Sequence, residues 1–190
     1  MTRLMIILGS VREGRIGGPI AEWVKAAADA DDRYDVDFVD LAELNLPFMD
    51  EPNHPRLKNY VKDHTKAWSK KIDELDGFVF VTPEYNHSIP GAFKNAFDSL
   101  GSEWAGKAVG FVSYGADNGV RAVEHWRTIV ANFQMHAVRQ QVSLSLFTEF
   151  GDVKIADFGV AKSPDTPQTL TNRVFGTMAY LPADRIAGRP

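Results

Sequence analysis

Three short polar segments hold the residue types that could do chemistry, and each lies between an apolar run and an amphipathic pattern. The first segment, residues 9–17, offers backbone N–H groups, the hydroxyl of Ser10 and the guanidinium groups of Arg12 and Arg15. Such donors just before a helix bind phosphate, so the segment predicts a site for a phosphate monoester. It lacks G-x-G-x-x-G spacing, which favours a mononucleotide over NAD. A solvated Gly/Arg turn is the alternative interpretation.

The second and third segments have residues suited to binding a flat ring. The second offers backbone amides and an aromatic side chain to a heterocycle, through Pro83, Glu84, Tyr85 and Asn86. The third, residues 113–119, follows another apolar run and contains glycines that would let the backbone approach a ring closely. Together the three segments predict a site for a small phosphorylated heterocycle.

The apolar periodicity predicts the elements that must position these segments. Strands are expected at residues 4–8, 36–39, 78–81, 108–112 and 138–146, and helices at residues 16–27, 57–75, 90–100 and 120–133. Continuous apolar strands alternating with helices predict an α/β fold, a doubly wound parallel sheet with helices on both faces. The loops that follow the strands converge at one edge of such a sheet, so the three polar segments should meet there.

Composition narrows the class of partner. The chain has 190 residues, a formal net charge of −4 and no cysteine, so it can form one well-buried domain without disulfides or a thiolate nucleophile. Its Lys and Arg residues are scattered, which argues against nucleic-acid and membrane-surface partners and favours a small molecule. Residues 4–8 are too short for a signal segment and no apolar run is long enough to span a membrane, so we expect a cytoplasmic protein.

With these motifs in place, about residues 1–150 resemble the NADPH-dependent FMN reductases, a flavodoxin-like group that includes quinone and azo-compound reductases. The matching runs are G-S-x-R at residues 9–12, T-P-E-Y-N at residues 82–86 with its continuation to Asp98, and Gly106-Lys107 followed by the third segment. The resemblance implies a five-stranded sheet of order 2-1-3-4-5, with FMN bound between the first and third strands. Residues 1–150 would then be the FMN-binding domain, and residues 151–190 an atypical tail rather than a domain of their own.

The resemblance also implies roles for individual residues. The expected cofactor-binding set is Ser10, Arg12, Arg15, Ile16 and Gly17 around the phosphate, Pro83, Glu84, Tyr85 and Asn86 along the ring, and Ser113 with Gly115 on its far side. NADPH would be the co-substrate, and FMN would pass its hydride to a small acceptor such as a quinone, an azo compound or a flavin. No catalytic side chain and no metal is expected. A non-enzymatic electron carrier of the flavodoxin type is the alternative.

A homodimer or homotetramer is expected as well. The family is usually oligomeric, and four aromatic side chains suggest more apolar surface than one sheet needs: Phe93, Phe97, Trp104 and Trp126. Arg121 could bind the NADPH phosphate or a neighbouring subunit, or it could be solvated. His87 could contact the ring or substrate, or it too could be solvated.

Two other motifs suggest different chemistry, and both fail in context. Residues 101–107 approach a Walker A loop, but they lack its final Ser/Thr and precede a strand instead of following one. Residues 153–184 resemble a protein-kinase activation segment, yet the chain has no glycine-rich kinase loop, no V-A-I-K lysine and no H-R-D. Kinase activity is therefore excluded, and we expect the tail at most to cover the fifth strand or to contact a neighbour.

Overall fold

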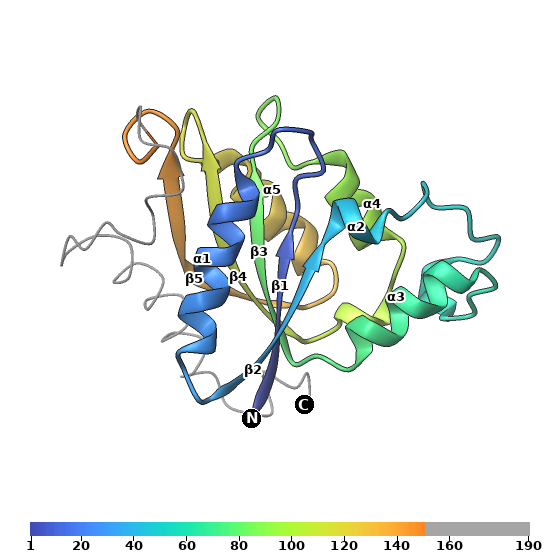
Figure 1. The fold of residues 1–190 in the computed structure, drawn as a ribbon. Helices are drawn as coiled ribbons and strands as arrows, with labels where there is room; N and C mark the ends of the chain where they lie inside the picture. Colours follow the sequence, from blue (N-terminus) through green and yellow to red (C-terminus); the bar gives the residue numbers. More distant parts are fainter. Residues whose placement is uncertain (151–190) are drawn as a thin grey trace.

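Five parallel strands form the centre of the computed structural model, which describes residues 1–150 (Figure 1). Their order in the sheet is β2-β1-β3-β4-β5, so the predicted fold class and strand order are confirmed. The strands are β1 (Thr2–Leu8), β2 (Tyr34–Asp40), β3 (Gly77–Pro83), β4 (Ala108–Gly115) and β5 (His136–Ser145). Every residue of β3 and β4 is buried, which explains why the central strands are continuous apolar runs.

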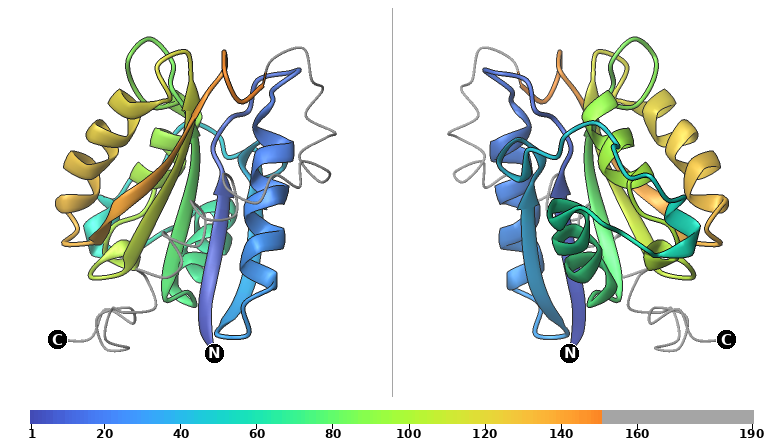
Figure 2. Two further views of the ribbon diagram at one scale, coloured as in Figure 1. Left: turned by 90° about the vertical axis from the view of Figure 1, so that its left-hand side faces the viewer. Right: turned by 90° about the vertical axis from the view of Figure 1, so that its right-hand side faces the viewer.

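Helices cover both faces of the sheet. Figure 2 shows α4 and α5 on one side and α1 on the other. The α-helices are α1 (Gly17–Asp29), α2 (Leu41–Leu44), α3 (Asp63–Asp73), α4 (Gly91–Asp98) and α5 (Val120–Ala131), and short 3₁₀ turns lie at η1 (Pro55–Leu57) and η2 (Ser102–Trp104). Because α1 leaves β1 toward one face and α4 leaves β3 toward the other, a crevice is expected between the ends of these two strands.

Aromatic side chains fill the core between the sheet and helices α3, α4 and α5. The Phe80 ring lies 4.8 Å from Phe93 and 5.0 Å from Trp126, measured between ring centroids. Phe93, Phe97, Trp104 and Trp126 are at most 1% exposed within the single chain. These four side chains therefore leave no surface for a partner, and the reasoning that used them to predict a dimer is wrong.

The third predicted helix begins later than its apolar pattern suggested. The sequence predicted a helix over residues 57–75, whereas α3 starts at Asp63, and Leu57 lies outside it with 68% of its surface exposed. The Glu51 carboxylate explains the late start, because it accepts hydrogen bonds from the backbone N–H groups of Val61 and Lys62, both at 2.9 Å. These bonds satisfy donors just before the helix, as a capping side chain would.

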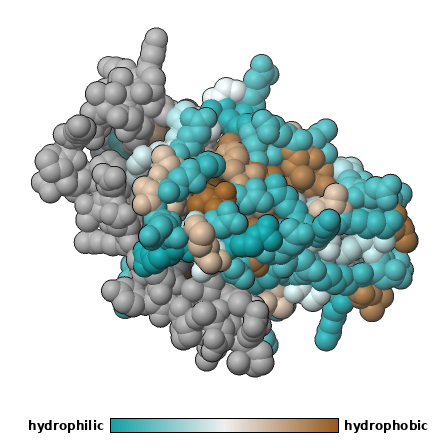
Figure 3. Space-filling model, turned by 60° about the horizontal axis from the view of Figure 1, so that its bottom comes forward, coloured by the Kyte–Doolittle hydropathy of each residue, from teal (hydrophilic) through white to brown (hydrophobic). Residues whose placement is uncertain are grey.

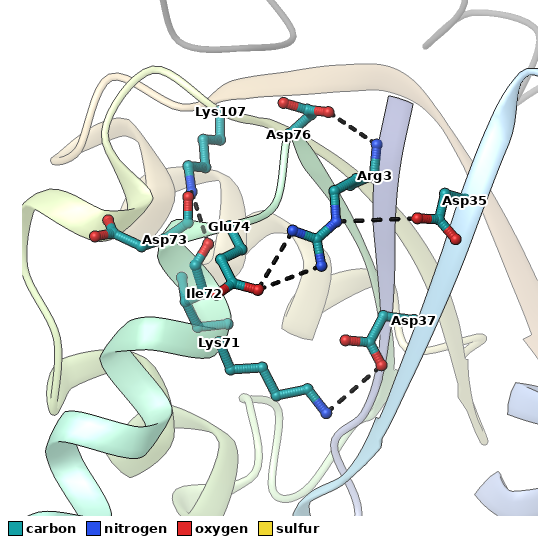
Figure 4. Close-up of polar contacts among 9 residues, drawn as sticks. All are labelled: Arg3, Asp35, Asp37, Lys71, Ile72, Asp73, Glu74, Asp76 and Lys107. Atoms are coloured by element: carbon teal, nitrogen blue, oxygen red, sulfur yellow. Dashed lines mark hydrogen bonds and ion pairs between the residues drawn. The ribbon is translucent and has the colours of Figure 1, made fainter. Parts of the chain in front are cut away.

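Ion pairs and one buried lysine hold α3 against the end of the sheet where the strands begin (Figure 4). Arg3 of β1 contacts Glu74 after the helix, and Lys71 lies 3.5 Å from Asp37 of β2. The buried Lys107 ammonium donates to the carbonyl oxygens of Ile72 at 2.7 Å and Asp73 at 3.1 Å. The lysine of the Walker-like run therefore binds the carboxyl end of α3, where the helix dipole favours a cation.

Some expectations concern residues beyond the described part of the chain. The kinase-like run at residues 153–184, and the covering role expected for residues 151–190, lie outside the described residues. Within residues 1–150, no helix combines the length and the apolar character needed to cross a membrane.

Because Lys107 is buried, the free energy of unfolding should vary with pH in the alkaline range. Burial lowers the pKa of Lys107 to about 8, whereas an unfolded lysine has a pKa of about 10.4. Between these values the unfolded chain binds more protons than the folded one, so stability rises with pH. We expect the free energy of unfolding of the native protein, measured with urea, to rise by about 1–2 kcal/mol from pH 8 to pH 9.5 relative to that of Lys107→Met.

The matched control is Lys70→Met, which removes an exposed lysine from α3 itself. This variant should keep the pH dependence of the native protein. Parallel curves for the native protein and Lys107→Met would contradict the prediction.

Candidate functional site

The loops after β1, β3 and β4 meet at the carboxyl edge of the sheet, as predicted. Two backbone hydrogen bonds tie the first two loops to the neighbouring strands: the Gly9 N–H donates to the Val81 carbonyl of β3 at 2.9 Å, and the Glu84 N–H donates to the Tyr114 carbonyl of β4 at 3.2 Å. The first loop can approach β3 because Gly9 has no side chain. A Cβ atom at this position would lie 2.2 Å from the Phe93 ring, so only glycine fits between β1 and α4.

A cavity of about 240 Å³ lies between the three loops. Eight of the eleven residues expected to bind a cofactor line it: Ser10, Arg12, Arg15, Ile16, Pro83, Glu84, Tyr85 and Gly115. The other residues of its lining are Tyr114 and Leu146. The first, second and third loops therefore contribute to one site.

The first loop brings hydrogen-bond donors to one end of this cavity. Ser10 is 1% exposed, and its hydroxyl shares a hydrogen bond of 2.7 Å with the Tyr85 hydroxyl. The exposed guanidinium of Arg12 makes no hydrogen bond or ion pair with any residue in the described part of the chain. Helix α1 follows at Gly17 with neither a capping side chain nor an acidic residue in its first turn, so its amino end keeps its partial positive charge.

Arg15 differs from Arg12 in having a fixed partner. Its guanidinium forms an ion pair with Asp40 at the end of β2, and both side chains are largely buried. The same carboxylate accepts a hydrogen bond of 2.9 Å from the Ala42 N–H and so caps α2. The charge of Arg15 is therefore already balanced, although its side chain still lines the cavity.

Glu84 connects the second loop to the third. Its carboxylate accepts a hydrogen bond of 3.1 Å from the backbone N–H of Arg121, in the first turn of α5, and one of 2.9 Å from the guanidinium of the same residue. The Glu84 side chain is 8% exposed, and Asp117 also pairs with Arg121. Arg121, whose role was left open above, thus holds two loops of the site in a fixed relation.

Comparison with known proteins identifies the family. The family model described as NADPH-dependent FMN reductase matches residues 2–149. The chain belongs to this family. It is 38% identical over 146 residues to an NAD(P)H-dependent FMN reductase of Schizosaccharomyces pombe, a match that covers 76% of this chain and 73% of that protein. It is 31% identical to a quinone reductase of Escherichia coli strain K12, over 67% of this chain and 69% of the relative.

The fold of this FMN reductase family member also matches a solved structure. FerB of Paracoccus denitrificans, a flavoenzyme NAD(P)H:(acceptor) oxidoreductase, superposes with a TM-score of 0.68 at 19% identity, covering 98% of this chain and 97% of FerB. An identity this low supports the fold only. Family membership makes FMN the cofactor and NAD(P)H the electron donor.

The residues of the reductase cavity fit FMN. A phosphate needs hydrogen-bond donors and positive charge, which Ser10, Arg12 and the amino end of α1 provide. The buried Tyr114 hydroxyl, which has no hydrogen-bond partner in residues 1–150, lies at the same end. A ring can lie against Pro83 and Gly115, where little side chain projects.

Three of the predicted residues lie outside the lining of the reductase cavity. Ser113 is fully buried, and its hydroxyl donates to the Asn118 carbonyl at 2.7 Å, so it shapes the third loop. Asn86 occupies an exposed turn with a φ of 49°, followed by His87 at 64°. Gly17 is buried at the start of α1, where a Cβ atom would be 2.3 Å from the Tyr114 hydroxyl.

Tyr114 is the residue that sequence reasoning missed. Side chains alternate between the two faces of a strand, so Ser113 and Tyr114 at the end of β4 point in opposite directions. This alternation, together with the hydroxyl of Tyr114, was the signal that Tyr114 could face the cavity.

The histidines add no metal site, because residues 1–150 contain no group of three or more His, Cys, Asp or Glu placed to hold an ion.

The Glu84 contact predicts coupled loops. Glu84→Ala removes two hydrogen bonds to α5, so we expect a loss of about 1–2 kcal/mol in unfolding free energy. Hydrogen exchange should speed up together in residues 84–88 and 115–121. Asp117→Ala is the control, because it also removes a partner of Arg121 but does not touch the second loop. Faster exchange in only one of the two segments of the Glu84 variant would argue against coupling.

Proposed function

We propose that this protein is an FMN-dependent NAD(P)H oxidoreductase that reduces a small acceptor such as a quinone, an azo compound or a flavin, with FMN held in the cavity between the three loops. The observation that carries this assignment is the cavity itself, where Arg12, whose guanidinium has no partner within residues 1–150, comes together with the buried Ser10 and the uncapped end of α1. The cavity lies at the carboxyl edge of the sheet, beside the point between β1 and β3 where the strand order reverses. Open α/β sheets bind ligands at this point, so the position supports the same conclusion.

The chain's own residues would bind the two ends of FMN differently. Arg12, Ser10 and the first backbone N–H groups of α1 would hold the phosphate. The Ser10 and Tyr85 hydroxyls hydrogen-bond to each other at 2.7 Å. When Ser10 donates to the phosphate, the Tyr85 hydroxyl would either donate its own proton to Ser10 or rotate away from it. The cavity of about 240 Å³ is smaller than the ~300–1,000 Å³ usual for ligand sites, so we expect the ring to extend to the open side near Pro83 and Gly115.

The chemistry proposed needs no acid or base from the protein. Bound FMN would supply the hydride exchange with NAD(P)H and the acceptor. Glu84, the one carboxylate in the cavity lining formed by residues 1–150, is engaged with Arg121. A hydrolytic or acid–base mechanism would need such a group to be available to the substrate.

We also propose that residues 1–150 contain the whole FMN site of one subunit, and that the protein is a cytoplasmic homodimer or homotetramer. The family match, which spans residues 2–149, supports the first part. Exposed apolar side chains support the second: Phe48 is 85% exposed and Met49 is 53% exposed. Separately, the lower face of the molecule shows hydrophobic residues among hydrophilic surface (Figure 3). Phe48 borders a second cavity of about 510 Å³ beside α2 and α4.

The test of function uses purified protein with FMN. We expect the spectrum of bound oxidised flavin and steady-state NADPH oxidation with a quinone. Arg12→Ala should raise the FMN dissociation constant about tenfold or more, because a charged hydrogen bond contributes ~1.5–3 kcal/mol. Arg56→Ala, the control, removes an exposed arginine outside this cavity and should leave binding unchanged.

Two results would contradict the assignment. Binding of FMN without NADPH oxidation would indicate a flavodoxin-type electron carrier. Equal FMN affinity in the native protein and Arg12→Ala would remove Arg12 from the phosphate site.

The oligomer is tested at Phe48. Analytical ultracentrifugation at micromolar concentration should show a dimer or tetramer for the native protein and a shift toward monomer for Phe48→Asp, because a charge is poorly accommodated in an apolar interface. Phe147→Asp makes the same change at another exposed phenylalanine and should keep the native assembly. A native protein that sediments only as monomer and is fully active would refute the proposal.

A further inference from the structure

Tyr114 carries a buried hydroxyl that the described fold does not satisfy. The residue is 4% exposed, and its hydroxyl oxygen has no hydrogen-bond partner in residues 1–150. Buried polar groups in native proteins are almost always hydrogen-bonded, and one left unpaired is destabilising. An unpaired hydroxyl therefore points to a ligand that is bound in the working protein.

The position of this hydroxyl shows where that ligand must lie. Tyr114 lines the cavity together with Ser10, Arg12 and Arg15. Its oxygen is also so close to the amino end of α1 that a Cβ atom on Gly17 would approach it to 2.3 Å. Glycine at position 17 thus leaves room for the hydroxyl beside the free backbone N–H groups of the first helical turn.

The surroundings specify the chemistry of the missing partner. The guanidinium groups of Arg12 and Arg15 act on the Tyr114 hydroxyl, and α1 contributes further N–H donors. The neutral acceptors close by are the hydroxyls of Ser10 and Tyr85, which already hydrogen-bond to each other at 2.7 Å, so the region has more donors than acceptors. Burial raises the pKa of Tyr114, which keeps its proton in place as a donor. The group that satisfies all of these donors at once is an anion with several acceptor oxygens, such as a phosphate monoester.

We propose that the Tyr114 hydroxyl donates a hydrogen bond to the phosphate of bound FMN and so makes the site selective for the phosphorylated flavin over riboflavin. This inference rests on the proposed FMN site and adds a residue to it. Because the donor is neutral and enclosed, it favours phosphate through a directed bond in addition to the charge of Arg12.

The substitution Tyr114→Phe removes only the oxygen atom, so it tests the bond without emptying the core. The FMN dissociation constant, measured by quenching of flavin fluorescence, should rise about tenfold or more. The dissociation constant for riboflavin should stay the same. The melting temperature of the apoprotein should be equal or higher, by up to about 2–4 °C, because an unpaired buried hydroxyl is lost.

Tyr60→Phe is the matched control. Tyr60 is also buried, but its hydroxyl donates to the Pro55 carbonyl at 3.3 Å and lies outside the cavity. This variant should melt at a lower temperature than the native protein and bind FMN with native affinity. Tyr114→Phe is thus expected to weaken FMN binding without loss of stability, and Tyr60→Phe to lose stability without weakening FMN binding.

Each alternative outcome has a distinct meaning. Native FMN affinity in Tyr114→Phe would overturn the inference and leave the proposed function intact. An equal loss of FMN and riboflavin affinity, or a lower apoprotein melting temperature, would show that Tyr114 shapes the cavity instead of binding phosphate, and would also overturn it. If the native protein binds neither flavin, the proposed function itself fails and the inference fails with it.

Discussion

Aromatic packing against β3 is the constraint on which the site depends. Phe80, near the middle of the strand, contacts Phe93 of α4 and Trp126 of α5, and the Trp126 indole N–H donates to the Thr82 hydroxyl at 3.3 Å. These rigid contacts set the distance of both helices from the carboxyl end of the strand. The helix that follows the second loop and the helix that follows the third are therefore placed by one cluster, and the loops that precede them are brought together.

Polar contacts also position the loops of the site. Gly9 passes next to Phe93 and hydrogen-bonds to Val81, which places Ser10 against the second loop. Glu84 then connects that loop to α5 through Arg121. Each contact joins a loop to a strand or helix that is distant in sequence, so the loops are held in place from several sides without being part of the regular sheet. A preorganised arrangement of this kind lowers the entropy that a ligand must lose to be ordered.

The sequence was sufficient for the sheet and for the location of the site, but not for every side chain. Continuous apolar runs predicted β1, β3 and β4, because strands buried on both faces need apolar residues at every position. The extent of α3 could not be predicted, since its start depends on Glu51, ten residues or more before the N–H groups it caps. The pairing of Arg15 with Asp40 and the inward direction of Tyr114 likewise depend on distances across the fold that local patterns do not encode.

The ion pair between Arg15 and Asp40 has a consequence for how a ligand reaches the cavity. Because Asp40 already balances Arg15, the cavity lining formed by residues 1–150 offers an incoming dianion one uncompensated guanidinium, that of Arg12, in a chain whose formal net charge is −4. Long-range attraction is then weak, and short directed bonds supply most of the affinity. The association rate constant should accordingly be lower than that of electrostatically steered encounters and nearly independent of ionic strength. Selectivity between ligands should then lie mainly in the dissociation rate constant.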